Sequence, residues 1–363
     1  MDRSRTGIRS GIDDQGLILS TQKQGDMKAV IMDAPKKMRV GKVPRPTPGE
    51  AEVLVKIAAA GVCAGDLHIY HGKSPYAIYP CIGGHEMAGI IDKIGSSVDH
   101  FEAGQKVVID PFIGCGKCYP CRVGKYNCCV NLRILGVHSP GGFAEYVSVP
   151  ANKLYKVPEN LSLAVAAFAE PIAIGIQACN RADVTSDDTV LVLGCGPIGM
   201  VTIEVAINRN ARVIAADINK ERLLIATEMG AETIVSDENL AEKIGTLTKN
   251  EGASVVIEAT GVAGIMEKTV ELVASGGRIV IVGLVPRGVG VTFPGLDFTR
   301  KELTILGSRT NKNCFPEALE LLRSKKILFP DLAKSFNMWD APSLFSKLSD
   351  NPGLYHKAVL VNE

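Results

Sequence analysis

Short apolar runs separated by glycine and proline dominate the first half of the chain, from residue 27 to about residue 173. Such runs, rich in branched apolar residues, are typical of β-strands rather than helices. Turn-forming segments such as PRPTPGE lie between them. The pattern predicts an antiparallel, barrel-like β domain whose strands are MKAVIM, AEVLVKIAAAGV, MAGIIDKIG, QKVVID and FAEYVSVP.

The pattern changes at Thr189, where buried strands begin to alternate with helical segments. Alternation of strand and helix predicts a parallel sheet that is covered by helices on both faces. The fold class is therefore α/β, with the barrel-like β domain joined to a Rossmann-type, doubly wound parallel sheet. The predicted strands are TVLVLG, RVIAAD, SVVIEAT and RIVIVGL, and the predicted helices are PIGMVTIEVAINRN and KERLLIATEMGA.

Beyond Asn313 the sequence predicts a helix over FPEALELLRSKK and a last strand over KAVLVNE, which can rejoin the β domain. The first 26 residues carry four basic and four acidic side chains and too short an apolar run for a secretory signal. We interpret them as a disordered leader. The predicted divisions are the leader at 1–26, the β domain at 27–174 and 313–363, and the doubly wound domain at 175–312.

Composition narrows the class of protein. The 40 basic and 39 acidic residues leave a net charge of +1, and 46% of the 363 residues are hydrophobic. This balance gives no charge excess that would attract nucleic acid or an anionic membrane. We also find no apolar run near the roughly 20 residues that span a bilayer. We expect a cytoplasmic globular protein that binds a small molecule and neither nucleic acid nor membrane.

The segment LGCGPIG has a G-x-G-x-x-G pattern between a predicted strand and a predicted helix. Its glycines permit a tight turn and let a pyrophosphate approach the N–H groups at the helix N-terminus. Asp217 ends the next strand and can accept hydrogen bonds from ribose hydroxyls, which favours NAD over NADP, while Arg222 can weaken that preference. A glycine turn that binds nothing is disfavoured by this spacing. The predicted cofactor-binding residues are Gly194, Gly196, Ile198, Gly199, Asp217, Arg222 and Gly283.

Five of the ten cysteines lie in the segment CGKCYPCRVGKYNCC, enough to supply four metal ligands. Cys115, Cys118 and Cys121 are spaced C-x2-C-x2-C, and Cys128 or Cys129 can supply a fourth sulfur. Four thiolates in one loop predict a closed tetrahedral zinc site, which is structural rather than catalytic. An iron–sulfur cluster or redox-active cysteines are the alternatives, and the absence of proline after the last cysteine disfavours them.

The segment CIGGHE places His85 and Glu86 directly after two glycines. GVCAGDLHIY upstream and FAEPIAIG downstream hold further residues of the types that ligate metals or transfer protons. Each of these residues taken alone is more often structural than metal-binding. The additional candidates are Cys63, Asp66, His68 and Glu170.

Together with the cysteine-rich segment and the nucleotide-binding pattern, these segments resemble the zinc-dependent medium-chain alcohol dehydrogenase family, from about Met27 to Glu363. The family pattern GHE-x2-G-x5-G-x2-V is complete in this chain. The resemblance implies a GroES-like catalytic domain and a homotetramer or dimer. It also implies Cys129 as the fourth ligand of the structural zinc, with Cys128 left as a buried, spare thiol.

The resemblance further implies a catalytic zinc on Cys63, His85 and Glu86, with Glu170 as an exchanging ligand or hydrogen-bonded to the zinc's water. One sulfur, one nitrogen and one carboxylate with an open position suit a catalytic zinc. Such a zinc lowers the pKa of the substrate hydroxyl before a hydride passes to the nicotinamide. Asp66 is expected to orient a zinc ligand, its alternative role being to cap a loop.

One position departs from the family pattern. Gly65 stands where family members have the serine or threonine whose hydroxyl carries the proton away from the alcohol. His68, which stands where the threonine dehydrogenase branch has its relay histidine, is expected to take this role with the help of water. The departure makes a close match to threonine dehydrogenase less probable and leaves open a regulatory protein with an inactive site.

The substrate is indicated by two further segments. AEP around Glu170 resembles the polyol, threonine and sugar dehydrogenases, and LGSRTNKNCFPEALELL resembles bacterial hexonate dehydrogenases. The latter oxidise the C5 hydroxyl of sugar acids such as L-gulonate or L-galactonate. Arg309 can bind a substrate carboxylate through two hydrogen bonds, the alternative being a contact to the cofactor or a neighbouring subunit. We expect a polyol or sugar-acid dehydrogenase, with threonine or a simple secondary alcohol as the rival substrates.

Overall fold

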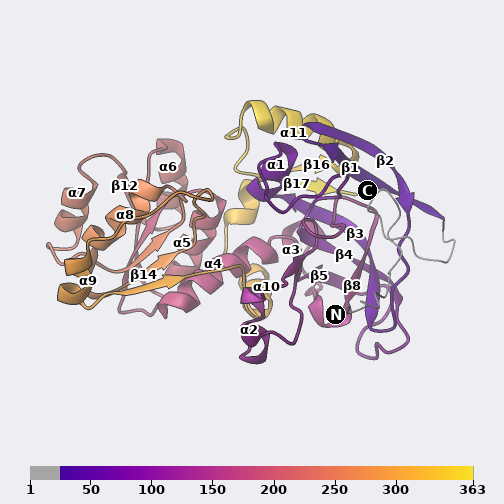
Figure 1. Ribbon diagram of the computed structural model, residues 1–363, viewed down its shortest axis with the longest axis horizontal. Helices are drawn as coiled ribbons and strands as arrows, with labels where there is room; N and C mark the ends of the chain where they lie inside the picture. Colours follow the sequence, from indigo (N-terminus) through magenta and orange to yellow (C-terminus); the bar gives the residue numbers. More distant parts are fainter. Residues whose placement is uncertain (1–24, 363) are drawn as a thin grey trace, which may run out of the picture.

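The computed structural model describes residues 25–362, which form two parts, each built around a sheet (Figure 1). The predicted leader lies outside the described residues as far as residue 24. Strand β1 (Asp26–Ala34) begins inside the range predicted for the leader and pairs antiparallel with β2 (Lys37–Pro44).

A seven-stranded, mainly antiparallel sheet forms the first part. Its order is β16-β17-β3-β4-β5-β9, with β8 paired to β3. The predicted return of the C-terminal strand is confirmed, because β17 pairs antiparallel with β3. The strands are β3 (Glu52–Val62), β4 (Glu86–Ile94), β5 (Lys106–Ile109), β8 (Tyr146–Pro150), β9 (Leu154–Lys156), β16 (Ala333–Asn337) and β17 (Lys357–Val361).

A six-stranded parallel sheet forms the second part, in the order β12-β11-β10-β13-β14-β15. Alternate residues of its central strand β10 enter different cores: Val190 and Val192 join one, Leu191 and Leu193 the other. Because both faces are covered, the strand can be apolar throughout. The strands are β10 (Thr189–Leu193), β11 (Arg212–Asp217), β12 (Glu232–Val235), β13 (Ala253–Glu258), β14 (Val273–Ile281) and β15 (Thr304–Gly307).

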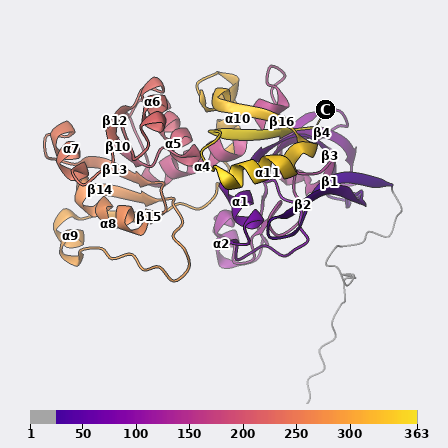
Figure 2. The ribbon, with the colours of Figure 1, turned by 90° about the horizontal axis from the view of Figure 1, so that it is seen from above.

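Helices cover this parallel sheet and fill the space between the two parts (Figures 1 and 2). Helix α4 belongs to a core that also contains Ala59 of β3 and Val190 of β10, so it packs against both sheets. The domain limit predicted at residue 174 falls inside α4, and the predicted limits stay predictions. The longer helices are α1 (Ala64–Tyr70), α4 (Ala169–Ala182), α5 (Pro197–Asn208), α6 (Lys220–Glu228), α7 (Leu240–Leu247), α8 (Ala263–Leu272), α9 (Gly295–Lys301), α10 (Phe315–Arg323) and α11 (Ala341–Asp350).

One helical stretch of the described chain, Leu163–Ala182, is long and apolar enough to cross a membrane by length and composition. The expectation that no apolar run approaches membrane-spanning length is therefore wrong. The 20 residues of this stretch are 72% buried inside the protein. A core helix that packs against two sheets can be as apolar as a membrane span. Burial in the protein core accounts for the apolar composition of this stretch.

A small lobe projects from the first sheet and contains only short elements. Two two-residue strands pair antiparallel, and an α-helical turn and a 3-10 turn lie between them in the sequence. The elements of the lobe are β6 (Phe112–Ile113), α2 (Tyr119–Arg122) and β7 (Arg133–Ile134). The short helix α3 (Leu163–Ala166) lies outside the lobe, just before α4.

Candidate functional site

The turn before strand β4 has a backbone that glycine alone tolerates easily. Gly84 has φ +88°, and a Cβ at this position would lie 2.6 Å from the Phe143 ring. A side chain here would meet both backbone strain and a steric clash. The turn therefore delivers His85 and Glu86, the first residue of β4, into the interior at a defined angle.

Asp66 ties this turn to the segment that carries Cys63. Cys63 caps the N-terminus of α1, and its backbone N–H donates to Asp66 Oδ2 at 2.9 Å. The Gly84 backbone N–H donates to Asp66 Oδ1 at 3.1 Å. The Asp66 side chain is fully buried, so it can hold the two segments together without competition from water.

The structure brings Cys63, His85 and Glu86 together, with one ligand atom of each lying within 4.8 Å of the others. His85 Nδ1 is buried without a hydrogen-bond partner and lies 3.8 Å from Asp66 Oδ1. Burial alone would lower the His85 pKa, but the charges of Asp66 and Cys63 raise it well above its usual value. The same negative groups that favour a proton on His85 can favour a metal cation in that proton's place, and these three donors fit zinc.

Glu170 lies near this group, although it is not one of the three donors. It is the second residue of α4, and its side chain is buried. Burial raises the pKa of Glu170 to about 8; His85 opposes this effect and Glu86 adds to it. Glu170 is thus close enough to His85 and Glu86 for their charges to shift its pKa. Either of its predicted roles requires this proximity.

Lys357 was missed by the sequence analysis. Its Nζ lies 2.5 Å from Glu86 Oε1, and both side chains are almost fully buried. A Cβ on Gly61 would lie 1.9 Å from Glu86 Oε2, so the glycine leaves room for the carboxylate. The available signal was a lone lysine at the start of the apolar strand KAVLV.

His68, the predicted proton relay, lies on the exposed side of α1. Asp66, two residues earlier on the same helix, is buried. His68 can therefore exchange protons with solvent. Gly65 has no hydroxyl that could pass a proton from the Cys63–His85–Glu86 group to His68. Among the described residues, no side-chain hydrogen bond connects His68 to that group.

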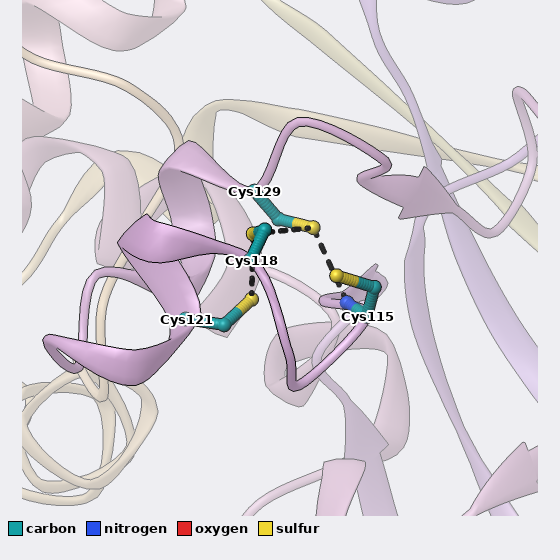
Figure 3. A group of neighbouring side chains, drawn as sticks. All are labelled: Cys115, Cys118, Cys121 and Cys129. Atoms are coloured by element: carbon teal, nitrogen blue, oxygen red, sulfur yellow. Dashed lines mark hydrogen bonds between the residues drawn. The ribbon is translucent and has the colours of Figure 1, made fainter.

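The second set of donors lies in the small lobe (Figure 3). The Sγ atom of Cys118 lies 3.4 Å from that of Cys121 and 3.7 Å from that of Cys129. Cys115 completes the group, with all four sulfurs within 4.8 Å of one another. Hydrogen bonds from the backbone N–H groups of Cys121 and Val130 lower the pKa of Cys118 to about 6. Burial raises the pKa of Cys121 to about 12, so a low pKa is not shared by the whole group. Four converging sulfurs nevertheless fit a structural zinc, whose charge favours the thiolate of each ligand.

The prediction that Cys128 is buried is wrong. Cys128 is exposed and lies outside the group of four sulfurs, whereas Cys129 is buried within it. The two cysteines follow one another at the end of a single 3-10 turn (Tyr126–Cys128), so their side chains point in different directions. The turn directs Cys129 into the lobe and Cys128 into solvent.

The dinucleotide pattern lies where strand β10 turns into helix α5. A Cβ on Gly199 would lie 1.8 Å from the Gly194 carbonyl oxygen, so the turn and the helix meet too closely for any side chain there. Gly196 is the N-cap and provides no side-chain cap, which leaves the first N–H groups of α5 free for an anion. Ile198 lies in the first turn of this helix.

Asp217 closes the same site from the end of β11. Its carboxylate accepts hydrogen bonds from the Cys195 N–H at 2.6 Å and the Asn219 N–H at 2.8 Å. Arg222 Nη1 lies 3.9 Å from Asp217 Oδ2, in range to reduce its negative charge. Gly283, just after β14, approaches Gly261 so closely that a Cβ would lie 2.2 Å from the Gly261 nitrogen.

Arg309 lies two residues beyond β15, at the carboxyl edge of the parallel sheet, and is exposed. Its backbone carbonyl accepts a hydrogen bond from Asn127 Nδ2 of the small lobe at 2.9 Å. The residue therefore lies where the sheet edge meets the first part of the protein. Ligands of such sheets bind at this edge.

Comparisons with known proteins agree with this geometry. Residues 49–159 match the alcohol dehydrogenase GroES-like domain, and residues 197–324 match the zinc-binding dehydrogenase domain. The starvation-sensing protein RspB of Escherichia coli is 37% identical, over 88% of this chain and 96% of its own. L-galactonate-5-dehydrogenase of Escherichia coli is 35% identical, over 80% of this chain and 84% of its own.

Solved structures give the same result. RspB of Escherichia coli CFT073, complexed with NADH, superposes with a TM-score of 0.86 and 35% identity, covering 93% of this chain and 99% of its own. A zinc-binding dehydrogenase of Sinorhizobium meliloti, bound to NADP, has a TM-score of 0.86 and 32% identity, covering 93% of this chain and all of its own.

The chain belongs to the zinc-dependent medium-chain alcohol dehydrogenase family, in its polyol and sugar-acid branch. The predicted fold class, with a GroES-like domain joined to a Rossmann domain, is confirmed. The protein is a zinc-binding, NAD-linked dehydrogenase, as the sequence predicts.

Proposed function

We propose that the protein oxidises a secondary hydroxyl of a sugar acid, such as the C5 hydroxyl of L-gulonate or L-galactonate, and transfers the hydride to NAD. The convergence of Cys63, His85 and Glu86 within 4.8 Å, with Glu170 buried nearby, carries the proposal. Glu170 suits a hydroxyl-rich substrate, and Arg309 at the sheet edge offers a cation for its carboxylate.

Different residues of the site would have different roles in the reaction. Cys63, His85 and Glu86 would hold the catalytic zinc, which when bound supplies a Lewis acid that lowers the pKa of the substrate hydroxyl. Asp66 fixes the backbone on both sides of this site through its two hydrogen bonds. The proton leaves through water to the exposed His68, because Gly65 provides no hydroxyl.

Asp217 supports the choice of NAD. Its carboxylate is held over the glycine turn by two backbone N–H groups, where it would meet the adenosine ribose and repel a 2′-phosphate. We infer from the family resemblance that the protein is a cytoplasmic homotetramer or dimer.

Zinc analysis and a screen for NAD reduction test this function. We expect about two zinc ions per chain and the highest kcat/KM with L-gulonate or L-galactonate rather than with sorbitol, threonine or butan-2-ol. Fastest turnover of threonine or butan-2-ol would favour the rival enzyme. Full zinc content without turnover of any alcohol would favour a regulatory protein.

The contribution of Arg309 is tested separately. Arg309→Ala removes a charged donor, so kcat/KM for hexonates should fall by about ten- to a hundredfold, mainly through KM. The matched control is Arg300→Ala, which alters another exposed arginine in the part of the protein that contains the parallel sheet. It should leave kcat/KM for hexonates unchanged. Equal activity on sorbitol and hexonates that Arg309→Ala does not alter would contradict the carboxylate contact.

A further inference from the structure

His138 has a fixed ring orientation that leaves one nitrogen free to donate. The Ile134 backbone N–H donates to His138 Nδ1 at 3.1 Å, and the His138 backbone N–H donates to the Ile134 carbonyl at 2.8 Å. Because Nδ1 accepts a hydrogen bond, the proton of the neutral imidazole is on Nε2. No hydrogen bond between described residues uses this Nε2–H.

The loop that carries His138 packs directly on the turn that delivers His85. A Cβ on Gly136 would lie 2.6 Å from the Gly84 carbonyl oxygen, and that oxygen accepts a hydrogen bond from the Gly142 N–H at 2.8 Å. His138 is thus held beside the proposed catalytic zinc site by a chain of backbone contacts.

One aromatic side chain from another segment packs beside the His138 ring. The Tyr76 ring centroid lies 5.7 Å from that of His138, with the planes tilted by 52°. Arg309 lies close enough for its charge to add to the effect of burial, and together they lower the His138 pKa. In the neutral imidazole the Nε2–H is the donor. The Arg309 guanidinium has no hydrogen bond or ion pair to any described side chain.

We propose that His138 is a specificity-determining residue, whose Nε2–H and the Arg309 guanidinium together bind the substrate's carboxylate. Both groups are hydrogen-bond donors, and neither side chain donates a hydrogen bond to another described residue, which suits an anion and offers less to a neutral hydroxymethyl group. They come from two separate segments, the loop after β7 and the segment after β15. This inference rests on the proposed oxidation of sugar acids.

Two substitutions separate donation by Nε2 from the structural role of Nδ1. His138→Asn keeps a side-chain oxygen near the Ile134 N–H but removes the outer donor. His138→Gln can place an amide N–H near the position of Nε2 but loses the bond to Ile134. The readout is kcat/KM for L-gulonate divided by that for sorbitol, which carries a hydroxymethyl group in place of the carboxylate.

We expect His138→Asn to lower this ratio about tenfold, mainly through the KM of L-gulonate, and His138→Gln to retain most of it. His100→Asn, at an exposed histidine of another loop, is the matched control and should keep the wild-type ratio. An unchanged ratio in His138→Asn, or a greater loss in His138→Gln, would overturn the role of His138.

The substrate preference of the wild-type enzyme shows whether the role of His138 or the proposed function itself has failed. If it prefers hexonates and only Arg309→Ala lowers the ratio, the proposed function stands and the inference on His138 falls. If it oxidises no hexonate, the proposed function falls and the inference falls with it.

Discussion

At the scale of single residues, the Lys357–Glu86 pair determines how negative the proposed zinc site is. The nearly buried side chains lie 2.5 Å apart, and burial alone would lower the Lys357 pKa; the charges of Glu86 and Cys63 raise it. Removing one member of such a pair leaves the other buried without a partner, at a cost of about 3–5 kcal/mol. A cation at the site is the other available partner for Glu86.

Lys357→Met should therefore destabilise the zinc-free protein more than the zinc-loaded protein. Without zinc we expect a loss of about 3–5 kcal/mol in the free energy of unfolding, and a smaller loss with zinc because the ion can neutralise Glu86. Thermal unfolding with zinc and after chelation measures both. Lys93→Met, at an exposed lysine of strand β4, should change stability by less than about 0.5 kcal/mol. Equal losses with and without zinc would contradict this account.

At the scale of elements, the small lobe has too little core to fold on its own. Among the described residues, its buried apolar cluster consists of Phe112, Cys129 and Leu132, with Ile134 and Ile174 partly buried against it. Its strands are two residues long. Small units of this kind need a crosslink or a metal, because their apolar burial does not offset the loss of chain entropy. The four sulfurs supply such a crosslink when zinc is bound.

Cys118→Ser should remove one zinc per chain and unfold the lobe, because Cys118 is the sulfur in contact with both Cys121 and Cys129. We expect the zinc content to fall from about two to about one and proteolysis to begin within the lobe. Metal analysis and limited proteolysis measure these effects. The control is Cys128→Ser, ten residues away and exposed, which should retain both ions. Two ions in Cys118→Ser would exclude the four-sulfur site.

At the scale of the whole molecule, Glu204 joins the helices of the parallel sheet to the chain that returns to the first sheet. This buried residue of α5 accepts hydrogen bonds from the N–H groups of Leu328 at 2.5 Å and Phe329 at 3.2 Å. Both donors lie at the start of a 3-10 turn (Phe329–Leu332) that precedes β16. Burial raises the pKa of Glu204 to about 7, while the two N–H groups oppose that shift.

This raised pKa predicts a pH-dependent contribution to stability. Between pH 4.5 and about 7 the folded protein keeps a proton on Glu204 that the unfolded chain releases, so stability falls as pH rises through this range. Glu204→Gln removes that titration. Relative to wild type, its stability should improve by up to roughly 3 kcal/mol between pH 5 and pH 8. Denaturant unfolding at several pH values measures the difference, and a constant difference would refute the assignment.

The sequence also determined the class of the protein, because the informative features are local. The glycines around Gly196 and the spacing of Cys115, Cys118 and Cys121 reflect requirements of one turn or one loop. Apolar periodicity likewise predicted the parallel sheet, whose central strands are buried on both faces. Polar or very short strands such as β12 and β7 escaped prediction, since neighbouring strands rather than their own residues stabilise them.

The sequence by itself thus determined the fold class and most ligand candidates, whereas only the tertiary structure decided how distant side chains combine. Lys357 and Glu86 are 271 positions apart and meet because β17 pairs with β3 beside β4. The exposure of Cys128 and the approach of Arg309 to His138 were decided in the same way. Local patterns record what one segment requires, but burial and partners depend on which segments pack together.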